Sequence, residues 1–150
     1  MKTIYFVQHG IAHAKDVDQK RSLSDIGNAE VHKVATSLRE HNIVIHKISH
    51  SGKLRARQTA AIFSEILGVN NLTELGGMDP GDNPSELIEQ ISEDAVMYIG
   101  HLPNLAKVVT QLVAEGVNYP VIKFQNSAVV CVEIDENSAS IKWFITPDIC

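Results

Sequence analysis

Short apolar segments that alternate with amphipathic helical patterns constrain the fold of this chain more than any other feature. Residues 3–7 and 95–99 are brief, mostly apolar runs, and residues 47–51 form another short strand candidate. Apolar side chains recur at helical spacing in three further groups: Val31, Val34, Ala35 and Leu38; Thr59, Ile62, Phe63, Ile66 and Leu67; Leu105, Val108, Val109, Leu112 and Val113. Strands that alternate with helices predict an α/β fold, a three-layer α/β/α sandwich with a mostly parallel sheet.

Capping residues indicate where the helices begin and end. Ser24 is a predicted N-cap, and Gly68 follows the second helical pattern at the position where a left-handed residue commonly ends a helix. The pair Asn83-Pro84 predicts the start of a further short helix. Gly116 is expected to cap the last helix.

The last third of the chain predicts a C-terminal hairpin. Residues 128–134 and 140–145 are strand candidates, and the polar residues between them are typical of a turn. No linker or internal repeat separates the predicted elements. Residues 1–150 are therefore expected to form a single domain, with a hydrophobic fraction of 44% that suits a soluble globular protein.

The charge balance excludes some partners. Thirteen Lys and Arg residues face eighteen Asp and Glu residues, for a net charge of -5. This balance gives no reason to expect binding to nucleic acid or to an anionic membrane, so an anionic ligand would need a local cluster of positive charge. The apolar run near the N-terminus is too short for a signal peptide or a membrane span. Cys131 lies in an apolar run and Cys150 is the last residue, so a reduced, cytoplasmic protein is expected.

Polar residues follow each of the first three predicted strands. His9 comes directly after the first strand, Arg55 shortly after the second, and His101 after the third. In folds of this class, ligands collect at the carboxyl ends of the strands, so these side chains are expected to converge. A neutral histidine can act as a nucleophile, and an arginine can donate two hydrogen bonds to phosphoryl oxygens. The pattern therefore predicts phosphoryl-transfer chemistry.

The ordered motifs resemble those of the histidine-phosphatase (phosphoglycerate-mutase-like) superfamily, and in particular its SixA-type phosphohistidine phosphatases. The resemblance extends from residue 4 to residue 103. The family begins with Arg-His-Gly, where this chain has Gln8-His9-Gly10. The other matching motifs are Arg21 to Gly27, Ser51 to Thr59, Pro80-Gly81-Asp82 and Gly100 to Pro103.

This resemblance implies a hydrolase and assigns a role to each site residue. His9 would be the nucleophile that carries the phosphoryl group, His101 the second histidine of the pocket, and Arg55 a phosphate clamp. Arg21 and Gln8 would contact the substrate. Neither a metal nor an organic cofactor is implied. The partner would be a protein that carries phosphohistidine or a small phosphorylated substrate.

Gln8 departs from the family pattern because an amide carries no charge where the family has an arginine. Arg21, Lys53 or Arg57 could compensate. Two alternatives therefore stay open beside the phosphohistidine phosphatase. One is a small-molecule phosphomonoesterase, and the other is a catalytically weak phosphate-binding or interaction module.

The proton donor for the leaving group is the least defined part of the predicted site. Gly77 stands where many relatives have Glu, and Glu74 and Asp79 are the neighbouring candidates. Leu102 after His101 excludes the acid-phosphatase pattern, which has Asp at that position. A weak acid suits a leaving group such as imidazole, whose pKa is about 6.5, and this favours a phosphohistidine substrate.

Two other interpretations are rejected. The pair His9 and His13 does not favour zinc, because His9 ends a strand instead of lying on a helix. Gly52-Lys53 is not a P-loop, because the first glycine and the final hydroxyl residue of that motif are missing. The remaining histidines have no matching acidic partners and are expected at the surface or in loops: His32, His41, His46 and His50.

Overall fold

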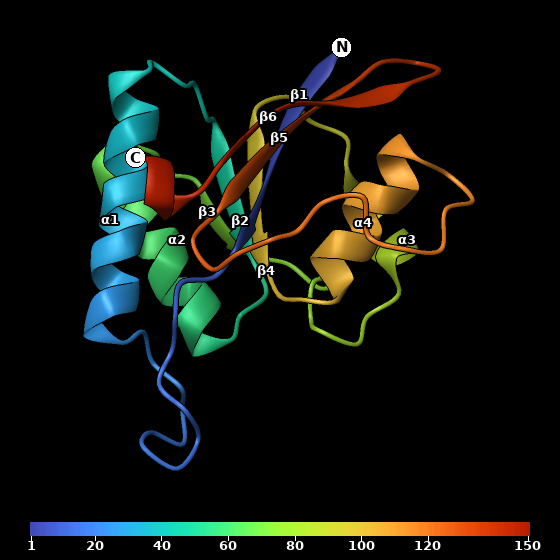
Figure 1. The fold of residues 1–150 in the computed structure, drawn as a ribbon. Helices are drawn as coiled ribbons and strands as arrows, with labels where there is room; N and C mark the ends of the chain where they lie inside the picture. The colour runs from blue at the N-terminus through green and yellow to red at the C-terminus, as the bar shows by residue number, and fades with distance from the viewer.

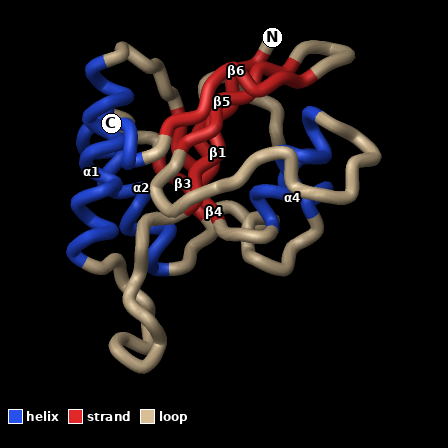
Figure 2. The backbone as a smooth tube through the Cα atoms, viewed as in Figure 1, coloured by secondary structure: helices blue, strands red, loops and turns tan.

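The computed structural model describes residues 1–150 and has the predicted α/β architecture, with one six-stranded sheet between two helical layers (Figures 1 and 2). The strand order is β3-β2-β4-β1-β5-β6. The strands are β1 (Lys2–Gln8), β2 (Lys47–His50), β3 (Leu72–Glu74), β4 (Val96–Gly100), β5 (Val129–Ile134) and β6 (Ala139–Ile145).

The helices cover both faces of the sheet. Figure 1 shows α1 and α2 on one side and α3 and α4 on the other. Their bounds are α1 (Asp25–Glu40), α2 (Leu54–Leu67), α3 (Pro84–Gln90) and α4 (Asn104–Val113), and a short 3-10 turn, η1 (Pro147–Ile149), follows β6. None of the helices has both the length and the apolar character needed to cross a membrane.

The pairing of β1 with its two neighbours determines the topology. The strands β3, β2, β4 and β1 run parallel, whereas β5 is antiparallel to β1 and β6 is antiparallel to β5. The predicted C-terminal hairpin is therefore confirmed. In the β1–β4 pair Gln8 lies opposite Gly100, so the residues that follow these two strands leave the sheet side by side.

Alternation along β1 divides the apolar core into two parts. Tyr5 and Val7 belong to the core beneath α1 and α2, whereas Ile4 and Phe6 belong to the core beneath α3 and α4. This alternation is the period-2 geometry of a strand that is buried on both faces. All four side chains are buried, with exposed fractions of 6% or less.

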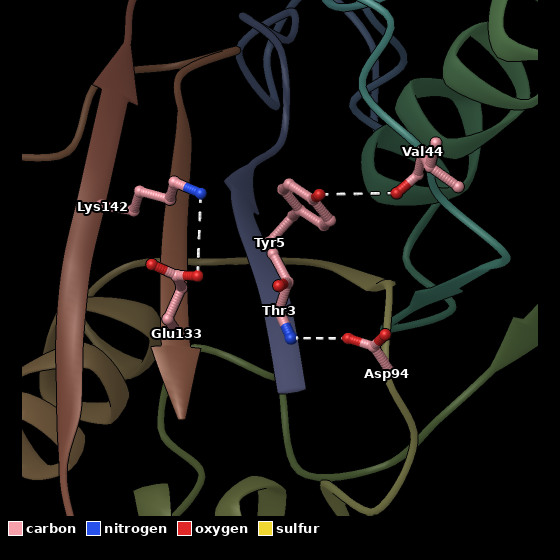
Figure 3. A network of polar contacts seen from close by, with 6 residues as sticks. All are labelled: Thr3, Tyr5, Val44, Asp94, Glu133 and Lys142. Carbon is pink, nitrogen blue, oxygen red and sulfur yellow. Dashed lines mark hydrogen bonds and ion pairs between the residues drawn. The ribbon is translucent and has the colours of Figure 1, made fainter. Parts of the chain in front are cut away.

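Polar contacts fix the part of β1 that lies away from its carboxyl end (Figure 3). The Thr3 amide donates to Asp94 Oδ1 at 2.7 Å, and the Tyr5 hydroxyl donates to the carbonyl of Val44 at 3.4 Å. Burial raises the pKa of Tyr5 to about 12, so its hydroxyl stays a donor at neutral pH. On the hairpin, Lys142 Nζ lies 3.7 Å from Glu133 Oε2. The contacts of Thr3 and Tyr5 tie β1 to the segments that precede β4 and β2.

The predicted helix caps are mostly confirmed. Ser24 Oγ accepts from the Gly27 amide at 3.0 Å, and Asn83 Oδ1 accepts from the Ser85 amide at 3.0 Å. Gly68 has the left-handed conformation, with φ of 68°. The prediction for Gly116 is wrong, because α4 ends at Val113 and Ala114 is its C-cap. Strand β3 was not predicted, since three half-buried or exposed residues at the sheet edge leave no apolar pattern.

The first turn of α1 packs closely against the chain that leaves β1. The Ile11 carbonyl accepts from the Ser24 amide at 3.0 Å. A Cβ atom at Gly27 would lie 1.9 Å from the same carbonyl oxygen. Position 27 therefore admits only glycine unless the backbone moves.

We expect Gly27→Ala to lower the free energy of unfolding by about 1–3 kcal/mol, the usual cost of overpacking. Urea denaturation measures the effect. Gly76→Ala is the matched control, because a Cβ atom there would have no heavy atom within 4 Å. Equal stabilities of the two variants would contradict the close packing of α1 on Ile11.

Candidate active site

The backbone of His9 is held by three separate parts of the chain. The His9 amide donates to the Gly100 carbonyl at 3.1 Å, which extends the β1–β4 ladder by one residue. Asn126 Nδ2 donates to the His9 carbonyl at 2.9 Å. The next amide, that of Gly10, donates to Thr59 Oγ1 on α2 at 3.0 Å. His9 is therefore fixed at the carboxyl edge of the sheet, with 8% of its surface exposed.

A hydrogen bond decides which nitrogen of His9 can react. His9 Nδ1 lies 2.7 Å from the Gly10 carbonyl oxygen. A carbonyl oxygen only accepts, so Nδ1 carries the proton and Nε2 keeps its lone pair. Burial, with smaller contributions from the charges of Arg55 and Arg21, lowers the pKa of His9 to about 4. At neutral pH this ring is therefore uncharged and keeps a free lone pair on Nε2, which is what a nucleophilic histidine requires.

The second histidine lies against the first, as predicted. The rings of His9 and His101 have centroids 4.9 Å apart and planes inclined at 50°. Burial and the nearby positive groups lower the pKa of His101 to about 3, so it too is uncharged at neutral pH. Its Nε2 lies 2.6 Å from Ser51 Oγ, whereas its buried Nδ1 has no hydrogen-bond partner.

Two arginines bring positive charge to the pocket. Burial and the charge of Arg21 lower the pKa of Arg55, and the charge of Asp79 opposes this effect, so these three groups lie near one another. Arg55 Nε is buried without a partner, and Arg21 Nε donates to the carbonyl of His13 at 3.0 Å. Neither guanidinium forms a salt bridge within the protein. Two neighbouring guanidinium groups without a paired carboxylate favour the binding of an anion.

Gln8 adds a polar group to this site without adding charge. Its Oε1 is buried and has no hydrogen-bond partner, and its carbonyl accepts from the Ser127 amide at 2.9 Å. Lys53 is close enough for its charge to lower the pKa of His101. Arg57 is exposed, and its charge acts on His50 instead. Of the three residues considered as compensation for Gln8, the structure therefore brings Arg21 and Lys53 to the pocket and leaves Arg57 outside it.

The two candidate acids lie in different surroundings. Asp79 lies near Arg55, and its buried Oδ1 has no partner. The loop that carries Asp79 is fixed, because the Asp79 amide donates to Asp82 Oδ2 at 3.0 Å. Glu74 is exposed on β3, opposite His50 in the strand register. Of the two candidate acids, Asp79 is therefore the one that the fold brings near Arg55.

His50 corrects one expectation from the sequence. It was predicted to be a surface or loop residue without an acidic partner, yet only 6% of it is exposed and Glu74 lies beside it. The partner was missed because it comes from β3, the strand that the sequence pattern did not reveal. His32, His41 and His46 are exposed, as expected. No three His, Cys, Asp or Glu side chains gather where they could hold a metal ion.

Sequence reasoning did not find two residues that support the site. Asn126 and Ser127 hold the backbone of Gln8 and His9 from a segment more than a hundred positions further along the chain. Ser127 is fully buried and has a left-handed backbone, with φ of 70°. No local pattern marks this turn, because its role depends on the pairing of β5 with β1.

Comparison with known proteins supports the fold assignment. No family model and no curated protein sequence matches the chain. Among solved structures, the protein histidine phosphatase SixA complexed with tungstate is similar with a TM-score of 0.83 and 22% identity, over 98% of each chain. A structure from Agrobacterium tumefaciens assigned as a SixA phosphohistidine phosphatase has a TM-score of 0.80 and 20% identity, over 97% of this chain and 98% of that one.

The same fold occurs in a phosphatase that acts on a small metabolite. The mycobacterial glucosyl-3-phosphoglycerate phosphatase complexed with VO3 has a TM-score of 0.74 and 13% identity, over 95% of this chain and 98% of that one. These likenesses confirm the predicted phosphoglycerate-mutase-like α/β/α fold.

The low pKa values predict how stability depends on pH. The pKa values of His9 and His101 are about 4 and about 3 in the folded protein, whereas an unfolded histidine titrates near 6.5. Between these values the unfolded chain binds protons that the folded chain does not. The free energy of unfolding should therefore fall as the pH drops from about 6.5 to about 4.

The variant His9→Gln should lose part of this fall, on the order of 3 kcal/mol at most, because its side chain cannot be protonated. Urea denaturation at several pH values measures the slope. His32→Gln, at an exposed histidine, should keep the slope of the wild type. An unchanged slope in His9→Gln would contradict a neutral, buried His9.

Proposed function

We propose that this protein is a phosphatase in which His9 Nε2 attacks phosphorus and carries the phosphoryl group covalently. The observation that carries the proposal is the bond from His9 Nδ1 to the Gly10 carbonyl, which leaves Nε2 with a free lone pair beside His101. Arg55 and Arg21 lie close by without carboxylate partners. The fold shared with phosphatases complexed with tungstate and VO3 supports the same chemistry.

The proposed reaction has two displacements at phosphorus. In the first, the Nε2 lone pair forms a bond to phosphorus, and the bond to the leaving group breaks and gives that group its electron pair. In the second, a water oxygen attacks phosphorus, the N–P bond breaks, and the lone pair returns to Nε2. The water proton leaves with the products. Arg55 and Arg21 stabilise the charge on the phosphoryl oxygens throughout, which is the main contribution a protein makes to this reaction.

We propose phosphohistidine on a protein as the substrate class. Asp79 is the candidate acid that lies near Arg55, and Gly77 stands where many relatives have Glu. An alkoxide leaving group needs a proton from such an acid, whereas imidazole, with a pKa of about 6.5, departs with little help. A site with a poor proton donor for the leaving group therefore suits an N-phosphorylated histidine better than a phosphate ester.

A small-molecule phosphomonoesterase is the second candidate. The buried and unpartnered Oδ1 of Asp79 favours it, because such an atom is placed to meet a polar group of a ligand. A metabolite phosphatase with this fold shows that the architecture admits the reaction. The relative rates on phosphohistidine and phosphoester donors separate the two candidates.

Trapping of the intermediate tests the proposed function. Wild-type protein, mixed with a ³²P-labelled phosphohistidine donor and quenched, should retain a label on His9 that is stable to alkali and labile to acid, as a phosphoramidate is. His9→Ala should retain none and should lose turnover. The exposed His32→Ala is the matched control and should label normally. A label on folded His9→Ala equal to that of the wild type would rule out His9 as the nucleophile.

Gln8→Arg tests whether the neutral residue limits activity. If Arg55 and Arg21 supply enough charge, wild type should turn over, and Gln8→Arg should change kcat by less than about tenfold while it binds inorganic phosphate more tightly. Gln111→Arg on the exposed face of α4 adds the same charge away from the site and is the control. Steady-state rates and inhibition by phosphate measure both effects.

Two other outcomes would favour the alternatives. An inert wild type that Gln8→Arg activates by about tenfold or more would identify a site weakened by the loss of one charged hydrogen bond. If both folded proteins are inert and neither labels at His9, the chain is a phosphate-binding or interaction module.

A further inference from the structure

Ser51 lies within hydrogen-bond distance of His101, and the reaction proposed above assigns it no role. Its Oγ lies 2.6 Å from His101 Nε2, and it also accepts from the Lys53 amide at 3.4 Å. The turn that holds Ser51 is itself fixed, because the Gly52 amide donates to His50 Nδ1 at 3.1 Å. The buried His50 therefore helps to place Ser51 at the second histidine of the pocket.

The two contacts of Ser51 favour one direction for its hydroxyl proton. A serine hydroxyl has one proton to donate and two lone pairs that accept. The Lys53 amide can only donate, so it occupies one lone pair of Oγ, and His101 Nε2 is the one acceptor within hydrogen-bond distance of the hydroxyl proton. Donation from Ser51 to Nε2 is therefore the arrangement that gives this proton a partner. Nε2 then accepts, and the single proton of the neutral ring lies on Nδ1.

The groups around His101 keep its ring neutral. Burial lowers the pKa of His101 most, and four neighbouring groups lower it further: His9, Arg55, Lys53 and Arg21. A neutral imidazole has one N–H group, so its tautomer decides whether the ring can donate into the pocket. Nδ1 is buried and has no hydrogen-bond partner in the protein. An oxygen of a ligand bound beside His9 is the partner left for it.

We propose that Ser51 is a positioning residue that holds His101 as the Nδ1–H tautomer, so that this N–H group donates to a phosphoryl oxygen during transfer to His9. The inference rests on the proposed phosphatase function. It adds an uncharged donor to the two guanidinium groups and requires no proton transfer from His101. An alanine at position 51 would leave Nε2 without its donor, and the ring could then place its proton on either nitrogen.

The tautomer can be measured without any enzymatic activity. In protein labelled with ¹⁵N-histidine, long-range ¹H–¹⁵N correlation at about pH 7 should show His101 with a protonated Nδ1 and an unprotonated Nε2. Ser51→Ala should shift His101 toward a mixture of tautomers, and Ser51→Thr, which keeps the hydroxyl, should preserve the wild-type signals. A wild-type His101 with its proton on Nε2 would overturn the proposal.

Kinetics tests the consequence for catalysis. With a phosphohistidine donor, Ser51→Ala should lower kcat by about ten- to a hundredfold, the usual effect of removing a group that orients a functional histidine, while KM changes little. Ser51→Thr should recover most of the rate. Ser64→Ala removes a serine hydroxyl on α2 that donates to the Val69 carbonyl, and the rate of this variant should match wild type. An unchanged kcat in Ser51→Ala would overturn the positioning role of Ser51. If the wild type is inert but His101 has its proton on Nδ1, the proposed phosphatase function is refuted and the tautomer assignment is not.

Discussion

The parallel pairing of β1 with β4 is the interaction on which the candidate site depends. This register places Gln8 opposite Gly100 and lets the His9 amide donate to the Gly100 carbonyl, so His9 and His101 leave the sheet at the same level. A slip of one residue would turn His9 to the other face of the sheet. The alternation of buried side chains along β1 prevents that slip, since it would exchange the side chains of two different cores. The hydrophobic pattern of β1 therefore fixes the position of His9 relative to His101.

The site concentrates features that lower the stability of the free protein. Arg55 and Arg21 lie near one another without salt bridges, and two buried histidines resist protonation. Arg21 and Ser127 have left-handed backbones, with φ of 50° and 70°, although neither is glycine. Strain of this kind persists where the surrounding structure fixes it, and it clusters at functional sites. An anion bound between the guanidinium groups would relieve their repulsion, so the pocket suits such a ligand.

Local sequence signals were enough to predict every α-helix and every strand except β3, and the ordered motifs predicted that His9, Arg55 and His101 meet. Ser24, Asn83 and Gly68 end or begin helices through contacts within a few residues, and such contacts are visible in the sequence. The strand order, the edge strand β3 and the Asn126–Ser127 turn depend on pairing between distant segments. His50 was misjudged for the same reason, because its burial and its neighbour Glu74 both come from β3 pairing.

Gln8 is compatible with this site because other side chains supply the positive charge that an arginine at position 8 would bring. The motif that Gln8-His9-Gly10 resembles has an arginine beside the histidine, and this chain brings Arg21 near Arg55 while the charge of Lys53 lowers the pKa of His101. A third guanidinium at position 8 would add repulsion to a pair that already lacks counter-ions, and burial would increase that cost. A neutral amide avoids this repulsion and can still donate a hydrogen bond. Glutamine at position 8 therefore lowers the positive charge of the pocket and still places a donor beside His9.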